Sequence, residues 1–179
     1  MTRKSALFIV GLLILLALFA RFFVIREQGD LAYKTEALRI GEVGSEHTHM
    51  SIRIYINDTP MDLSLPEYQL QSPIVHTEDG DGAYIHKHAT GVTLTDFLDS
   101  IKVKLTTECI TFDTLLQYCS NDSATLETYL NREPFSDWSN YELRQGDKIL
   151  ITYGKDDPIS LSLKLNSVID LSGELDDND

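Results

Sequence analysis

The stretch HTEDGDGAYIHKHATGVTLTDFL, residues 76–98, organises the rest of this chain. It starts at the end of a short β-like run at 74–76, and a turn rich in Asp and Gly at 78–82 separates that run from a second one at 84–88. Two such runs joined by a Gly-rich turn predict a β-hairpin. The second run leads through Gly91 towards a helix.

That helix is predicted to begin directly after the hairpin. Thr93 and Asp96 match the T-x-x-D pattern of a capping box, in which the two residues satisfy backbone N–H groups of the first turn. Apolar residues follow at the i, i+3, i+4 and i+7 spacing of one helix face, namely Leu94, Phe97, Leu98 and Ile101. We expect this face to pack on a sheet.

Histidines are concentrated around the hairpin. The chain has five of them, His47, His49, His76, His86 and His88. The first two and the last two form His-x-His pairs in predicted strands, where residues two apart project to the same face. The hairpin would also bring His76 towards His86. Because imidazole binds Zn, Cu, Ni or Fe, we expect at least three of the five to bind one transition metal, with Zn or Cu as candidates.

An alternative explains these histidines without a metal. They could be surface histidines, or members of a hydrogen-bond network beside an acidic loop. Convergence requires the strand that carries His47 and His49 to lie beside the hairpin at 74–88, and periodicity alone does not decide that pairing.

The alternation of apolar and polar residues predicts the first strand. One face carries Met50, Ile52, Ile54 and Ile56. The other carries Ser51, Arg53 and Tyr55 together with His47 and His49. A turn at 57–60 should end this strand, because Asn and Asp favour turns and Pro cannot donate to a ladder. Further strands are predicted at 61–65, 103–105, 126–131 and the end of 141–153. After Asp157-Pro158 a helix is favoured over the strand-like alternation of the same residues. This order of elements predicts an α+β fold.

The chain has two cysteines, Cys109 and Cys119, on either side of a turn near 113–114. A hairpin would place them opposite each other, where a disulfide can form; the alternative is two buried thiols. Disulfides persist in oxidising compartments, and the N-x-S/T triplets at Asn57 and Asn121 also fit an exported domain. The Cys-x9-Cys spacing differs from the Cys-x-x-Cys pattern of thiol-disulfide enzymes.

The N-terminal part is apolar. After a short segment at 1–5, residues 6–25 supply the roughly 20 apolar residues that a membrane-spanning helix needs. Leu18 spoils the small-x-small pattern of a cleavage site, which favours a retained anchor. A spacer is predicted at 26–46, with a weak helical run at 31–40. The expected location is therefore the cell membrane, single-pass, with the domain outside the cytoplasm.

The negative net charge of the chain limits which partners it can bind. Asp and Glu total 28 against 15 Lys and Arg, for a net charge of −13. Such a chain repels phosphates, so no nucleic-acid partner is expected, and its field favours cations. No Ser-His-Asp order or phosphate-binding Gly loop is visible, which makes an enzyme the less favoured interpretation.

The segments TGVTLTDFLDSI, YLNREPF and LRQGDKILITYG, in this order, resemble the β-grasp families that include ubiquitin-like sulfur carriers and cobalamin-binding SLBB-type domains. HTHMSIRIYIND, VHTEDGDGAYIHKHATGVTLTDF and GDKILITYG are together similar to a little-characterised group of membrane-anchored prokaryotic proteins, mostly archaeal. The likeness spans 47–154. It implies a β-grasp-like domain, a mixed sheet with one main packed helix, behind a single N-terminal transmembrane helix, and leaves 155–179 as a C-terminal helix or acidic tail. It implies no activity, and the Gly-Gly tail of a sulfur carrier is missing.

Three functions are compatible with these patterns. The first is a membrane-anchored, extracytoplasmic domain that binds or handles a transition metal through its histidines. The second is a non-catalytic interaction module, or an accessory subunit with a membrane-protein partner. The third, a thiol-disulfide oxidoreductase, fits the cysteine spacing least well.

Overall fold

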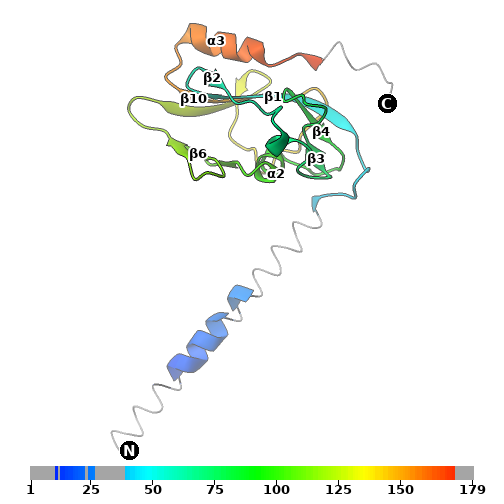
Figure 1. The fold of residues 1–179 in the computed structure, drawn as a ribbon. Coiled ribbons are helices and arrows are strands. Elements are labelled where there is room, and N and C mark those ends of the chain that lie inside the picture. The colour runs from blue at the N-terminus through cyan, green and yellow to red at the C-terminus, as the bar shows by residue number, and fades with distance from the viewer. Residues whose placement is uncertain (1–10, 12, 23, 27–38, 172–179) are drawn as a thin grey trace, which may run out of the picture. The chain divides into compact units, whose positions relative to one another are not determined.

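A computed structural model of the protein describes residues 11, 13–22, 24–26 and 39–171 (Figure 1). The chain divides into two compact units, Met1–Ile40 and Gly41–Asp179. In the first unit, the described residues from 11 to 26 are helical. The strands discussed below belong to the second unit.

The predicted transmembrane helix at 6–25 is wrong. Within the described part of the chain, no helix combines the length and apolar character needed to cross a membrane. A crossing helix needs about 20 apolar residues. The single-pass membrane location that followed from it is corrected too. Most of the helical run predicted at 31–40 lies outside the described residues.

The main sheet of the second unit is mixed and has seven strands. They are β1 (Thr48–Ile56), β2 (Thr59–Pro60), β3 (Val75–His76), β4 (Tyr84–Lys87), β8 (Thr125–Leu130), β9 (Glu133–Pro134) and β10 (Lys148–Gly154). Their order is β3-β4-β1-β10-β8-β9, with β2 paired to β1 beside this path. β1 runs parallel to β10 and antiparallel to β4. β1 and β10 are therefore the central strands.

Alternating burial explains the central position of β1. Met50, Ile52 and Ile54 are almost completely buried, as their shared face predicts. The opposite face carries Tyr55, which packs against a buried cluster formed by Tyr129, Leu150 and Val168. In β10, successive residues are buried on both faces, which is the pattern of a strand covered on two sides.

Two α-helices pack in this unit, α2 (Leu94–Ser100) and α3 (Pro158–Ser167), and a 3-10 turn, η1, spans Pro66–Tyr68. Figure 1 shows α3 on one side of the sheet and α2 on the other. The predicted capping box of α2 is confirmed, because Thr93 caps the helix and the Asp96 carboxylate accepts from the Thr93 backbone N–H at 2.7 Å. Leu94, Phe97 and Leu98 are buried.

Helix α3 begins at a capping aspartate. The Asp157 carboxylate accepts from the backbone N–H groups of Ile159 and Ser160 at 2.9 and 2.8 Å, which satisfies two of the four unpaired donors of a helix N-terminus. Leu161 and Leu165 then pack against a cluster on β8 and β10. These contacts place α3 over the β1-β10-β8 part of the sheet.

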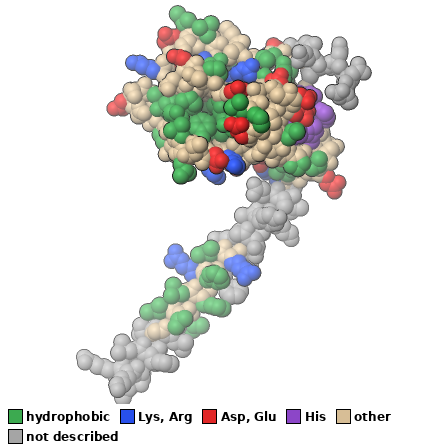
Figure 2. All heavy atoms as spheres, in the orientation of Figure 1, with side chains coloured by type: hydrophobic (Ala, Val, Ile, Leu, Met, Phe, Trp, Pro, Cys, Tyr) green, Lys and Arg blue, Asp and Glu red, His purple; other side chains and the backbone are tan. Residues whose placement is uncertain are grey.

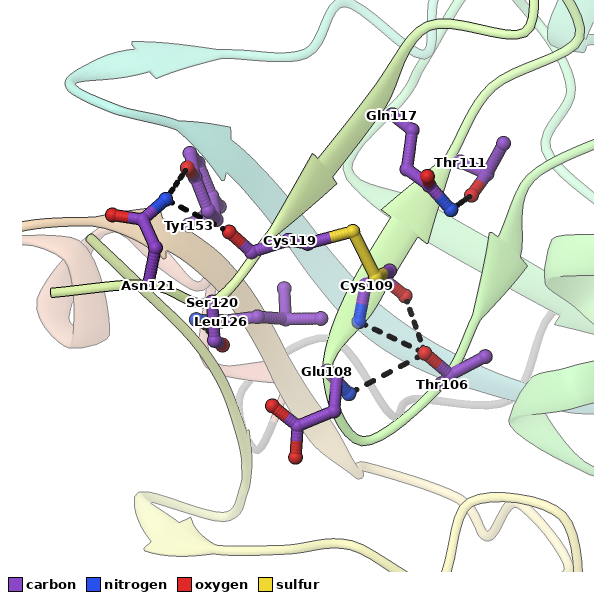
Figure 3. The surroundings of a disulfide bond; sticks show 10 residues. All are labelled: Thr106, Glu108, Cys109, Thr111, Gln117, Cys119, Ser120, Asn121, Leu126 and Tyr153. Carbon is purple, nitrogen blue, oxygen red and sulfur yellow. Dashed lines mark hydrogen bonds between the residues drawn. A yellow bond between two sulfur atoms is a disulfide. The ribbon is translucent and has the colours of Figure 1, made fainter. Parts of the chain in front are cut away.

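A separate three-stranded sheet consists of β5 (Lys104–Leu105), β6 (Cys109–Thr111) and β7 (Gln117–Cys119). Cys109 and Cys119 are directly opposite in the β6–β7 ladder and form a disulfide, so the predicted bond is confirmed (Figure 3). The Thr106 hydroxyl oxygen accepts from the backbone N–H groups of Glu108 and Cys109 and closes the turn before β6. The bond indicates an oxidising compartment.

The expected architecture, a β-grasp-like domain with one main helix behind a membrane anchor, is corrected. The structure is a mixed α/β fold with two sheets and with α3 packed on the sheet in addition to α2. The strand predicted at 61–65 is wrong as well. β2 ends at Pro60, and the Asp62 carboxylate accepts from the backbone N–H of Ser64 at 3.1 Å, which forms a turn instead.

Candidate metal centre

Sheet pairing brings the three histidine-bearing strands together. β4 lies between β1 and β3, and its residue His86 is opposite His49 on β1 and opposite His76 on β3. The first strand therefore lies beside the hairpin, which is the pairing that convergence of the histidines requires. Residues opposite each other on adjacent strands project to the same face, so the pairing gathers the imidazoles on one side of the sheet edge.

We call His47, His49, His76, His86 and His88 the histidine cluster. Neighbouring ring centroids are 4.6 Å apart for His49–His86, 4.8 Å for His47–His49, 4.9 Å for His47–His88 and 4.9 Å for His76–His88. The remaining gap, between His76 and His86, is 6.2 Å. The five rings thus form a closed circuit, and the His86 and His88 rings are also 6.4 Å apart across it.

The buried Lys87 explains why His86 and His88 point away from the core. It lies between them in the sequence and projects to the opposite face, where its ammonium group contacts Glu46 at 2.7 Å and Glu142 at 3.0 Å. It also donates to the Leu143 carbonyl at 2.8 Å. Since β4 alternates, anchoring Lys87 on one face directs both histidines to the other.

Backbone hydrogen bonds hold the ends of these strands. The His49 N–H donates to the Gln145 side-chain oxygen at 2.8 Å, and the Gly146 N–H donates to the His49 carbonyl at 2.8 Å. The His88 N–H donates to the Ile74 carbonyl at 2.8 Å. The turn before β10 and the segment before β3 therefore position the histidine backbones.

Three members of the cluster could hold one metal ion. The ligand atoms of His47, His49 and His86 all lie within 4.8 Å of one another. The Nε2 atoms of His47 and His49 are 3.0 Å apart. Two nitrogens bound to one tetrahedral zinc ion are about 3.3 Å apart, given Zn–N bonds of about 2.0–2.1 Å, so this spacing needs little adjustment.

His76 is oriented by the backbone. Its Nδ1 lies 2.6 Å from the carbonyl oxygen of Ser72. A carbonyl only accepts, so Nδ1 carries the proton and Nε2 carries the free lone pair of the neutral ring. Metal-binding histidines commonly have one nitrogen fixed in this way.

Glu78 contacts two imidazoles at once. One carboxylate oxygen lies 3.3 Å from His76 Nε2, and the other lies 3.1 Å from His86 Nδ1. The His86 Nδ1 atom is buried and has no aligned hydrogen bond among the described residues. Sequence reasoning assigned Glu78 only to a turn. The His-x-Glu spacing of His76 and Glu78 was the available signal, because residues two apart on an extended chain share a face.

The surroundings favour neutral imidazoles. Burial is the largest effect on the pKa of His86 and lowers it below 6.5; the nearby histidines lower it further, whereas Glu78 opposes the shift. Burial likewise lowers the pKa of His88, followed by repulsion from His76 and His47. Neutral imidazole is the form that binds a metal.

The cluster lies where α3 does not cover the sheet. On the α3 side of β1, the helix covers Tyr55. The segment after the helix covers Ser51, whose hydroxyl donates to the Ile169 carbonyl at 2.8 Å. His49 and His47 occupy the next positions on this face, and His47 is exposed. Figure 2 shows histidine side chains reaching the surface together, next to acidic ones.

No family model, curated protein or solved structure significantly matches the chain. The resemblance to membrane-anchored prokaryotic proteins therefore stays a prediction, as does the alternative of an interaction module or accessory subunit. For the third function, a thiol-disulfide oxidoreductase, the structure shows only that both cysteines are joined in one disulfide.

Proposed function

We propose that this protein binds a transition metal ion, zinc or copper, at the histidine cluster, with His47, His49 and His86 as the ligands. The observation that carries the proposal is the proximity of these three side chains, whose ligand atoms all lie within 4.8 Å of one another. Imidazole nitrogen suits both metals. Three protein ligands leave one position of a four-coordinate ion open.

The exposure of the site is what supports metal holding and exchange, since an open coordination position by itself is the arrangement of catalytic zinc sites. His47 is exposed, so an ion bound there could be reached by a ligand from solvent or from another molecule. The net charge of −13 adds a field that attracts cations. These features support a protein that acquires an ion and keeps it accessible.

A metal titration of the full-length, tag-free protein tests the proposal. The wild type should bind Zn²⁺ in a competition assay against a chelating dye. The variant His49→Ala/His86→Ala should bind it more than about 100-fold more weakly, because it loses two direct ligands, and loss of an outer-shell partner alone typically costs 10–100-fold.

A matched control is available on the same strand. Thr48 lies between His47 and His49, projects to the other face, and its buried hydroxyl has no hydrogen-bond partner in the described part of the chain. Thr48→Ala should therefore retain wild-type affinity. Equal Zn²⁺ binding by wild type and His49→Ala/His86→Ala, or no binding at micromolar metal, would overturn the proposal.

Metal binding should also depend on pH. Protons compete with the metal for each imidazole, and the pKa values of His86 and His88 are lowered from 6.5, chiefly by burial. Zn²⁺ affinity should therefore decrease as the pH falls, and the contribution of His86 should be lost only below pH 6.5. Affinity that is constant between pH 7.5 and pH 5 would contradict imidazole ligation.

The same pKa shifts also predict how the stability of the metal-free protein changes with pH. Between the lowered folded pKa values and 6.5, the unfolded chain binds more protons than the folded one. The free energy of unfolding should therefore decrease as the pH falls through this window. Thermal unfolding with and without Zn²⁺ at pH 7.5 and pH 5.5 measures both effects, and stabilisation by Zn²⁺ should be larger at pH 7.5.

A further inference from the structure

We propose that the histidine cluster holds two metal ions, and that Glu78 and the pair His76 and His88 form the second subsite. This inference rests on the proposed function, because it divides the same cluster between two ions. His47, His49 and His86 bind the first ion. The Glu78 carboxylate bridges the two and takes the fourth position of the first ion, so the open position lies on the second ion, which has three protein ligands.

The number of ligands exceeds what one ion can use. Zinc in proteins is almost always four-coordinate, and the cluster offers five imidazoles and a carboxylate. Three of the imidazoles have mutually close ligand atoms. The two left over, His76 and His88, are themselves neighbours, with ring centroids 4.9 Å apart.

The contacts of His76 indicate that a cation belongs beside it. Its Nδ1–H is used by the Ser72 carbonyl at 2.6 Å, so its Nε2 lone pair faces a Glu78 oxygen 3.3 Å away. A protonated ring would pair with this carboxylate directly, whereas the neutral ring places its lone pair beside an anionic oxygen, an arrangement that a shared cation satisfies. A metal ion between the two atoms forms two coordinate bonds and matches the tautomer that the carbonyl selects.

The other oxygen of Glu78 makes the bridge. It lies 3.1 Å from His86 Nδ1, which is buried without an aligned hydrogen bond. One carboxylate therefore reaches both a member of the first set and a member of the second. In two-metal sites the ions are about 3.5–4 Å apart, a separation that the two oxygens of a single carboxylate can span.

The mixture of ligands narrows the choice of metal. Five imidazoles and one carboxylate, without thiolate or thioether, suit Zn²⁺ or Cu²⁺ better than Cu⁺, which prefers soft sulfur ligands. Both cysteines are unavailable because they form the disulfide. The cluster should thus take up divalent ions.

Stoichiometry tests the inference. The full-length, tag-free protein, stripped with a chelator, is dialysed against excess free Zn²⁺ and its bound metal is measured. The wild type should hold two ions per chain. His76→Gln/His88→Ala should hold one, with the affinity of the remaining site changed by less than about tenfold. Because His76 is 8% exposed, near-UV circular dichroism should confirm folding, and His88→Ala alone serves as a second variant.

Glu78→Gln tests the bridge. It should reduce the stoichiometry to one ion and weaken that remaining site by more than about tenfold, because the first ion also loses a direct ligand and an outer-shell partner alone typically contributes 10–100-fold. Asp79→Asn is the matched control, since it removes a neighbouring exposed carboxylate and asparagine tolerates the left-handed backbone found there, with φ 57°. This control should still hold two ions.

The outcomes separate the two proposals. One ion in the wild type, unaffected by His76→Gln/His88→Ala, would overturn the second subsite and leave the proposed function intact. Two ions in Glu78→Gln would overturn the bridge. No bound ion in the wild type would overturn the proposed function together with this inference.

Discussion

Replacing Lys164 with methionine is expected to lower the free energy of unfolding by about 3–5 kcal/mol, the usual cost of removing one partner from a buried ion pair. The Lys164 ammonium group lies 2.6 Å from the Asp156 carboxylate, and both side chains are 6% exposed. It also donates to the Asn57 carbonyl at 2.7 Å. Without it, Asp156 would remain buried and charged, and α3 would lose the hydrogen bonds from Lys164 to the Asn57 carbonyl and the Thr152 hydroxyl. Urea unfolding measures the change.

A matched control is Lys148→Met. Lys148 pairs with Asp170, but these side chains are 30% and 57% exposed, so its loss should cost no more than about 1 kcal/mol. The double variant Lys164→Met/Asp156→Leu should be more stable than Lys164→Met alone, because it leaves no unpaired buried charge. Equal losses for Lys164→Met and Lys148→Met would show that the Lys164 pair contributes no more than a surface pair.

The same pair should contribute to acid unfolding. Burial acts to raise the pKa of Asp156, but hydrogen bonds from Lys164, Thr152 and Ser160 outweigh it and hold the pKa below 3.8. A carboxyl group with a lowered folded pKa stabilises the fold above its unfolded value, and this contribution disappears as the pH falls through the folded pKa. Lys164→Met should therefore flatten the dependence of stability on pH below about pH 4.

Replacing both cysteines by serine is expected to lower the free energy of unfolding by about 2–4 kcal/mol, mainly because the reduced unfolded chain gains conformational freedom. The bond closes a short loop, with a sequence separation of 10. Wild-type protein treated with dithiothreitol should unfold at the same urea concentration as Cys109→Ser/Cys119→Ser. In addition, thiol labelling of the denatured, unreduced wild type should find no free thiol.

The single variants complete this test. Cys109→Ser and Cys119→Ser each remove the bond and should be as unstable as the double variant. A double variant as stable as the wild type would contradict the prediction. It would show that the hydrogen bonds and packing of the β6–β7 hairpin are sufficient without the disulfide. Zn²⁺ affinity should be unchanged in all three variants, because the cysteines belong to a different sheet from the histidines.

Local patterns were sufficient for several elements. The alternation of Met50, Ile52 and Ile54 predicted a strand with one buried face, and the Thr93–Asp96 pair predicted the helix start. The turn between the cysteines predicted a hairpin that pairs them. Each of these features depends on interactions between residues close in sequence, so period and spacing are enough to reveal them.

The wrong sequence-based predictions concern segments whose local pattern fits more than one structure. Apolar composition at 6–25 predicted a membrane anchor, whereas no helix in the described residues is long and apolar enough for that role. At 61–65, the Asp62–Ser64 hydrogen bond replaced a strand with a turn. A short apolar run satisfies several structures, and hydropathy alone does not distinguish between them.

The sequence by itself determined which histidines share a strand face, because side chains on an extended chain alternate whatever the strand packs against. Only the tertiary structure decided that β1 pairs with β4, that His49 lies opposite His86, and that Glu78 reaches both His76 and His86. Strand pairing joins residues distant in the chain, and its register depends on the packing of the whole sheet, including the buried Lys87 that holds β4 in its orientation.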